Sequence, residues 1–395
     1  METIKTYPLN KALKIVIENC YLQVNKHEVL IPYLSGPPGM GKTRTIQKIC
    51  AERHWCVISI HLAMKPIEEL GGIPRFKKIT YFGNTINTTV WTLPDIMKEL
   101  YEKSEEVTKL HDKLYDEGII KVKNPVVILM LDDIHLAGED TEPLLFECLT
   151  ERKIREHALT PITALVLLGN HGLNKAGART MNAAIMNRVM LMDSHADYDY
   201  WKSNFALENV HPSIVSFLGN DNYKKYFHEE ELTDLPWASP RTWTGLSTHI
   251  KAKEAWERTV SSEDILYMAI GSVGKEAATY FSEYYSIFSK FNIPYILSKG
   301  LEYILPTAPL DRYALSYALV SFYIESKEKK KIVNSVSTII YLFSKKYPDL
   351  LLMILNEIKG LNNSTYLFTD ILSCLKQIDQ TIIPTLLKDF GKFIN

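Results

Sequence analysis

A glycine-rich run followed by a lysine and a threonine is the first feature of the chain that could do chemistry. It reads Gly36, Pro37, Pro38, Gly39, Met40, Gly41, Lys42 and Thr43, and it fits G-x-x-x-x-G-K-[ST] at every fixed position. In such a loop, backbone N–H groups turn inward around a phosphate, and the helix that follows adds its positive end. Lys42 would reach the β- and γ-phosphates of a nucleotide, and the Thr43 hydroxyl would bind Mg²⁺. In this segment the predicted nucleotide-binding residues continue to Arg44.

An apolar run that ends in two acids is the second such feature. Residues 126–131 are unbroken apolar residues, as in a strand buried on both faces, and Asp132 and Asp133 follow them. Carboxylates at the C-terminal end of a buried strand are what Mg²⁺–nucleotide chemistry needs. Asp132 would hold Mg²⁺, directly or through water. Asp133 would orient or deprotonate the attacking water.

Asn170 is the third candidate, because it follows another apolar run, residues 164–168, after Gly169. An amide at the tip of the strand beside the phosphate loop can hydrogen-bond the attacking water or the γ-phosphate. Gly-Asn is also common in ordinary strand-ending turns. Spacing alone leaves both interpretations open.

The segments around these residues predict an α/β fold. Residues 29–34 are typical of a strand before the loop, residues 43–51 of a helix after it, and residues 55–60 of a second strand. Two strands joined by a helix form the βαβ unit of a parallel sheet. Farther along, residues 79–82 and 88–92 predict a small inserted hairpin around Gly83-Asn84.

Length and composition exclude several classes of protein. The chain has 395 residues, too many for one ordinary core, so two or three domains are expected. The net charge of −1 argues against a constitutive nucleic-acid binder. The five cysteines lack C-x-x-C spacing, which predicts free thiols in a reducing compartment. With neither a signal peptide nor a membrane-length apolar run in the sequence, we expect a cytoplasmic protein without a membrane span.

The order of the motifs resembles that of the AAA+ ATPases, and in detail that of the MoxR family of chaperone-type AAA+ proteins. After Asn170 the order continues with Met186-Asn187-Arg188 and then with Pro240-Arg241. Residues 66–74 resemble the family's P-x-D-L-x-G-x-P segment, and residues 91–94 resemble the stretch that closes its helix-2 insert. The resemblance covers most of the chain and stops near residue 325.

The resemblance implies a ring, usually a hexamer, that binds ATP or ADP with Mg²⁺ between its subunits. Asn170 would be sensor 1, Arg188 the arginine finger that reaches into the neighbouring subunit, and Arg241 sensor 2 on a helical lid. An arginine supplied across an interface can accelerate phosphoryl transfer by about 10³–10⁵-fold. Arg179 is a competing finger candidate. Without the family order, a surface salt bridge would be the favoured interpretation of Arg188.

The implied domains are three. Residues 1–195 would form the large α/β nucleotide-binding domain, with the helix-2 insert at about 61–95. Residues 196–325 would form the helical connection and the lid. Residues 326–395, which the resemblance does not cover, show helical patterns and would form an added subdomain. In the insert, Tyr81 and Phe82 would either face the pore of the ring and grip a peptide or pack on the hairpin's own small core.

Asp133 departs from the family's pattern, in which the second acid is usually glutamate. Its carboxylate lies about 1 Å closer to the backbone, and a misplacement of that size can cost on the order of 10²-fold in rate. The expected function is that of a MoxR-type ATPase that hydrolyses ATP slowly and remodels or matures a protein partner. In this family the partner is often a von Willebrand factor A domain protein. The alternatives are a nucleotide-gated assembly scaffold with little hydrolysis and, weakened by the neutral charge, a DNA-directed motor or loader.

Overall fold

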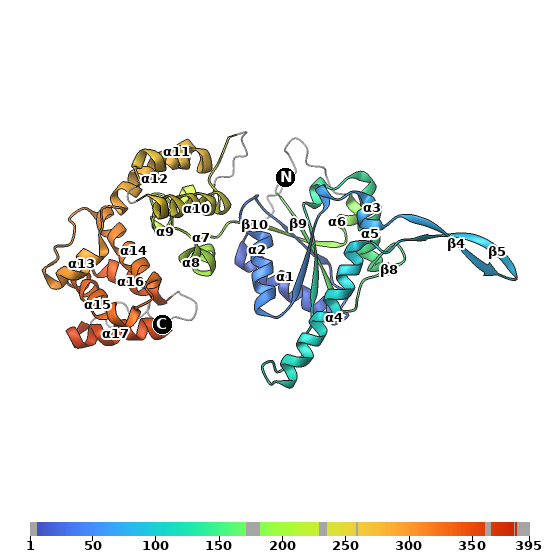
Figure 1. Cartoon of the computed structure of the whole chain (residues 1–395), viewed down its shortest axis with the longest axis horizontal. Coiled ribbons are helices and arrows are strands. Elements are labelled where there is room, and N and C mark those ends of the chain that lie inside the picture. The colour runs from blue at the N-terminus through green and yellow to red at the C-terminus, as the bar shows by residue number, and fades with distance from the viewer. Residues whose placement is uncertain are drawn as a thin grey trace. The chain divides into compact units, whose positions relative to one another are not determined.

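The computed structural model describes residues 6–170, 182–228, 235–257, 260–359, 365–382 and 384. The chain divides into two compact units, Met1–Asp197 and Tyr198–Asn395 (Figure 1). The first combines a parallel sheet with helices, and the second is helical. Among the described residues, no helix has both the length and the apolar character needed to cross a membrane.

The first unit is built on a six-stranded sheet in the order β1-β10-β2-β9-β6-β3, and every pairing in it is parallel. The strands are β1 (Tyr7–Pro8), β2 (Ile31–Ser35), β3 (Cys56–His61), β6 (Val127–Asp132), β9 (Thr163–Gly169) and β10 (Val189–His195). The predicted class, an α/β fold with a parallel sheet followed by a helical region, is confirmed. Five strands were expected, and the two-residue β1 adds a sixth at the edge beside β10.

The helices of this unit are α1 (Leu9–Val24), α2 (Lys42–Glu52), α3 (Ile67–Gly71), α4 (Asp95–Asp116), α5 (Glu142–Glu151) and α6 (Ala183–Met186). Strands β2, β6 and β9 are buried along their whole length, as expected for parallel strands covered on both faces. Helix α1 is fixed to β9 by a buried amide. The Gln23 side chain both donates to and accepts from the backbone of Leu165, each bond being 2.9 Å.

The parallel arrangement brings the candidate residues to one edge of the sheet. Since the strands run in one direction, the carboxyl ends of β2, β9, β6 and β3 meet there. The glycine-rich loop follows β2, Asn170 follows β9, and Asp132 ends β6. In open α/β sheets, ligands bind at this edge, where the strand order reverses. The reversal lies at β2. Strands β3, β6 and β9 lie on one side of it in the sheet, and β10 and β1 lie on the other.

The insert is a two-stranded ribbon of β4 (Pro74–Tyr81) and β5 (Asn84–Trp91) with eight residue pairs. A second, shorter hairpin joins β7 (Lys153–Ile154) to β8 (His157–Ala158). The β4–β5 ribbon is longer than predicted, and its turn is Phe82-Gly83 rather than Gly83-Asn84. Both turn residues have positive φ, 47° and 77°, as the favoured two-residue hairpin turn requires.

The ribbon extends away from the rest of its unit (Figure 1). Phe76 and Phe82 are 85% and 89% exposed, so packing on a small core of the hairpin is the wrong interpretation for Phe82. The side chain of Tyr81 lies outside the described part of the structure. At its base, the ribbon is fixed by the Trp91 backbone N–H, which donates to Glu156 Oε1 at 2.9 Å, and by Arg155, stacked 4.3 Å from the centroid of the Trp91 ring.

The second unit begins with α7 (Tyr198–Trp201), a π-helical turn (Lys202–Ala206) and α8 (Leu207–Asn209). The remaining helices are α9 (Pro212–Gly219), α10 (Pro240–Trp256), α11 (Ser262–Val273), α12 (Lys275–Phe288), α13 (Ile293–Lys299), α14 (Pro309–Glu325), α15 (Lys329–Lys346), α16 (Pro348–Lys359) and α17 (Thr365–Ile378). Helices α13 to α17 contribute to one apolar core. The end of the helical pattern predicted for residues 326–395 lies outside the described residues, except for residue 384, from residue 383 onward. A separate subdomain from residue 326 stays a prediction.

Candidate nucleotide site

The glycine-rich loop adopts a backbone that its glycines permit. Gly39 and Gly41 have φ of 79° and 98°, in the left-handed region that glycine enters without strain. A Cβ on Gly36 would lie 2.6 Å from the Ser194 carbonyl oxygen and 2.7 Å from the Met40 sulfur. Any side chain at Gly36 would therefore push the loop away from β10. Helix α2 starts at Lys42, directly after the loop, so its N-terminal N–H groups are available to a phosphate.

Lys42 is buried, and its ammonium group is directed into the loop. Its Nζ donates to the carbonyl oxygens of Gly36 and Pro37 at 2.8 and 3.0 Å. It also donates to Asn170 Oδ1 at 3.1 Å. The structure thus brings the predicted lysine and the predicted strand-tip amide together across 128 residues of sequence.

Thr43 and Asp132 also meet. The Thr43 hydroxyl donates to Asp132 Oδ2 at 2.9 Å, and Asp132 is buried. Mg²⁺ prefers oxygen ligands and usually takes only one or two from the protein, with water and substrate phosphates completing its octahedron. The donor set fits that ion: Thr43 and Asp132, the two residues for which the sequence predicts this role, would hold Mg²⁺ from the protein side.

Asp133 has a left-handed backbone, with φ of 58° and ψ of 37°. Its N–H donates to Asp132 Oδ1 at 2.9 Å. Aspartate and asparagine are enriched among the few non-glycine residues that adopt this conformation, and such outliers cluster at active sites. The local backbone therefore gives a physical reason for aspartate, rather than the longer glutamate, at this position.

Two histidines that sequence reasoning missed lie beside these acids. His61 ends β3, opposite Asp132 in the strand register, and its Nδ1 lies 3.9 Å from Asp132 Oδ2 and 3.7 Å from Asp133 Oδ2. His135 lies in the 3₁₀ turn Ile134–Leu136, where its Nδ1 is 3.4 Å from the backbone nitrogen of Asn170. Their place at or just after the ends of neighbouring strands was the available signal, because those ends meet in a parallel sheet.

Burial lowers the pKa of His135. The Asp133 carboxylate acts in the opposite direction, the Lys42 ammonium lowers the pKa further, and Asp132 raises it. The net shift is downward, which favours the neutral imidazole at physiological pH. Nδ1 of a neutral ring can accept the Asn170 N–H when the proton is on Nε2.

Arg188 lies at the opposite end of the sheet from the loop. It directly precedes β10, and its carbonyl accepts the N–H of Ile31, the first residue of β2. The loop follows the last residue of β2, five residues farther on, or about 16 Å along the strand. The Arg188 guanidinium lies 4.4 Å from the Phe146 ring centroid, and Nη1 donates to the Ala184 carbonyl at 2.8 Å. The structure does not bring Arg188 to the loop of its own chain.

The other predicted arginines fall in three places. Arg44 is exposed on the first turn of α2. Arg241 is exposed on the first turn of α10, in the second unit. It lies between Ser239 and Thr242, which form the capping box of that helix. Arg179, the competing finger candidate, lies outside the described residues.

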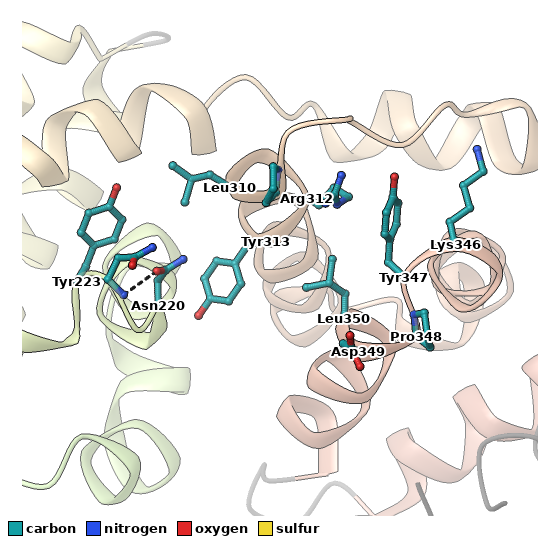
Figure 2. Close-up of a pocket in the computed structure, with 12 residues that line it drawn as sticks. Asn220, Tyr223, Leu310, Arg312, Tyr313, Lys346, Tyr347, Pro348, Asp349 and Leu350 are labelled. Carbon is teal, nitrogen blue, oxygen red and sulfur yellow. Dashed lines mark hydrogen bonds between the residues drawn. The ribbon is translucent and has the colours of Figure 1, made fainter. Parts of the chain in front are cut away.

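A cavity of about 640 Å³ lies within the helical unit, between the ends of α9 and α15 and the starts of α14 and α16. Figure 2 shows Tyr223, Tyr313 and Tyr347 around it. The Arg312 guanidinium lies 4.0 Å from the Tyr347 ring centroid and donates to the Thr307 carbonyl. The residues that line this cavity include none of those that the sequence motifs singled out.

No protein-family model matches the chain, and no curated protein matches it. Among solved structures, it is similar to the RuvB Holliday junction branch migration motor of Thermotoga maritima, with 13% identity, 73% of this chain and 76% of that chain covered, and a TM-score of 0.33. Two single-residue variants of the same RuvB match at 13% identity, with 79% and 78% of this chain and 85% and 80% of theirs covered. Their TM-scores are 0.33 and 0.34. Similarity at this level carries no argument about function, which therefore rests on the geometry of the site.

Proposed function

We propose that this chain is an AAA+ ATPase of the MoxR type that binds ATP or ADP with Mg²⁺ and hydrolyses ATP. The observation that carries the proposal is the meeting of Lys42 with Asn170 and of Thr43 with Asp132 at the carboxyl edge of a parallel sheet. Each contact joins two motifs far apart in the sequence. A chance glycine-rich turn has no reason to meet an amide and a carboxylate in this way.

The residues divide the work of phosphoryl transfer. The loop backbone and Lys42 bind the phosphates, and Thr43 with Asp132 places Mg²⁺, which neutralises charge on the phosphate oxygens. Asp133 orients or deprotonates the attacking water, and Asn170 positions that water or the γ-phosphate. Positioning and electrostatic stabilisation account for nearly all catalysis of this reaction. The short Asp133 side chain makes hydrolysis slow.

Arg188 supports a site shared between subunits. Since it lies about 16 Å along β2 from the loop of its own chain, a role at the γ-phosphate requires the loop of a neighbour. Its planar guanidinium suits bidentate phosphate contact. We propose that copies of the chain form a closed ring, a hexamer by its MoxR resemblance, with Arg188 as the finger and Arg241 as sensor 2.

The partner in this proposal is a protein that the ring remodels or matures in the cytoplasm, with a von Willebrand factor A domain protein as the first candidate. The β4–β5 ribbon supports a protein contact, because it exposes two phenylalanine side chains outside any core. Exposed aromatic residues of this kind are enriched where proteins bind one another.

Asp133 favours one rival function, a scaffold that assembles with nucleotide and barely hydrolyses it. ATP turnover by the purified chain separates the two, with Lys42→Ala as the background. Turnover above that background, lost in Asp133→Asn, is the expected result. Tight nucleotide binding with turnover equal to that of Lys42→Ala would favour the scaffold.

A further inference from the structure

We propose that His135 is a positioning residue, which fixes Asn170 against Lys42 so that the amide meets the γ-phosphate. This inference rests on the proposed ATPase function and deepens it. His135 belongs to none of the motifs that indicated nucleotide binding. It acts through Asn170.

The geometry holds Asn170 at two points. Its backbone N–H donates to His135 Nδ1 at 3.4 Å, and its side-chain Oδ1 accepts from Lys42 Nζ at 3.1 Å. One contact fixes the main chain at the tip of β9, and the other fixes the direction of the amide. With both in place, the amide lies beside the ammonium group that would bind the β- and γ-phosphates.

The position of His135 follows from the turn after β6. The left-handed backbone of Asp133 ends the strand and starts the 3₁₀ turn Ile134–Leu136. This turn places the imidazole against the tip of β9, the strand that pairs with β6. The Asp133 carbonyl accepts the Leu136 N–H at 2.8 Å, so the residue proposed to act on water and the support of Asn170 belong to one hydrogen-bonded turn.

The ring's chemistry fits the contact. An N–H donor requires Nδ1 to accept, and a partly buried, neutral imidazole with its proton on Nε2 does so. An asparagine at this position would also present an acceptor oxygen, whereas alanine would present none. Comparing His135→Ala with His135→Asn therefore separates the loss of the hydrogen-bond acceptor from the loss of the imidazole ring.

The test compares His135→Ala, His135→Asn, Asn170→Ala and the double variant of His135→Ala with Asn170→Ala. The exposed His27→Ala serves as the matched histidine control. For each protein, kcat and KM for ATP are measured, together with Kd for ADP and for a non-hydrolysable ATP analogue. Thermal unfolding and ADP binding report whether each variant is folded.

We expect His135→Ala to lower kcat on the order of tenfold or more, as misplacement of a positioned group does, while Kd for ADP stays within about threefold. His135→Asn should recover most of the lost rate. The double variant should be no slower than Asn170→Ala, because residues that act through one another are not additive. A His135→Ala rate within about twofold of wild type, or fully additive losses in the double variant, would overturn the proposal.

Failure of the ATPase proposal gives a different result. If wild type hydrolyses ATP no faster than Lys42→Ala, the ATPase function is wrong, and the two dissociation constants still test His135. The wild-type preference for the ATP analogue over ADP should shrink in His135→Ala, because Asn170 would no longer face the γ-phosphate. An unchanged preference would overturn the role of His135 on its own.

Discussion

The two ends of the parallel sheet carry different parts of the proposed site. At the carboxyl end of the strands, Lys42, Thr43, Asp132 and Asn170 are joined by hydrogen bonds of 2.9 and 3.1 Å. At the opposite end, the Arg188 guanidinium lies against the Phe146 ring and donates to the Ala184 carbonyl of α6, the helix that precedes it. In the proposed site, the first end would bind the nucleotide, and the second would supply an arginine that lies about 16 Å along β2 from the loop of its own chain. If the proposed ring forms, this difference means that each subunit carries both halves of a site and that only two neighbouring subunits can join them.

The largest expected effect comes from the carboxyl end. Lys42→Ala removes the ammonium group that meets the phosphates, so ATP turnover should fall to background and nucleotide affinity should fall by at least about tenfold. Isothermal calorimetry with ATP and a phosphate-release assay measure the two quantities. Lys48→Ala, exposed on the same helix, should leave both within about twofold. Equal effects of the two substitutions would contradict the assignment of phosphate binding to the carboxyl end of the sheet.

Arg188→Ala should affect turnover without affecting binding within one subunit. Because an arginine supplied in trans contributes about 10³–10⁵-fold, turnover should drop by about 10³-fold or more. Binding of ADP under dilute conditions should stay within about threefold of wild type. Arg53→Ala is the matched control, since Arg53 also stacks on a ring, that of Trp55 at 5.8 Å. Loss of ADP binding by the dilute variant would mean that Arg188 acts at the nucleotide site of its own chain. It would contradict the division of the site between the two ends of the sheet.

Asp133→Asn should have a smaller effect on turnover than Arg188→Ala. The substitution keeps the size of the side chain and removes its charge, so kcat should fall on the order of 10²-fold while Kd for ADP with Mg²⁺ changes by less than about threefold. Single-turnover hydrolysis resolves the slow rate. An unchanged rate would assign water activation to another group.

The smallest effect is expected at the ribbon. Phe82 is 89% exposed, so Phe82→Ala should change the free energy of unfolding by less than about 0.5 kcal/mol. Basal turnover should stay within about twofold, whereas stimulation by a protein partner should be lost. Thermal unfolding and ATP turnover with and without the partner measure these quantities. A strong loss of basal turnover would instead indicate that the ribbon takes part in ATP hydrolysis itself.

Much of the carboxyl end could be predicted from sequence, because its parts are local motifs that a parallel sheet must bring together. Lys42, Asp132 and Asn170 each follow or end an apolar run, and the strand direction then fixes their meeting. The residues that support these groups were missed because they belong to no local motif. His61 and His135 gain their contacts from neighbouring strands, and the left-handed backbone of Asp133 leaves no pattern in composition.

The ribbon was predicted at its turn but not along its length. Residues 74–78 are exposed, so they lack the alternation of buried and exposed side chains that marks a strand packed on a core. Arg188 shows a further limit. Its residue type and place in the motif order indicated phosphate contact, but only the strand register showed that it lies at the far end from its own loop.

Mixing two inactive variants tests the shared site most directly. Lys42→Ala lacks a working loop and keeps Arg188, whereas Arg188→Ala keeps the loop and lacks the finger. In a mixed ring, some interfaces join an intact loop to an intact finger. We predict that the mixture hydrolyses ATP clearly faster than either variant alone, at a rate that depends on the mixing ratio. A mixture no faster than the average of its components, in rings shown to exchange subunits, would contradict a site completed between subunits.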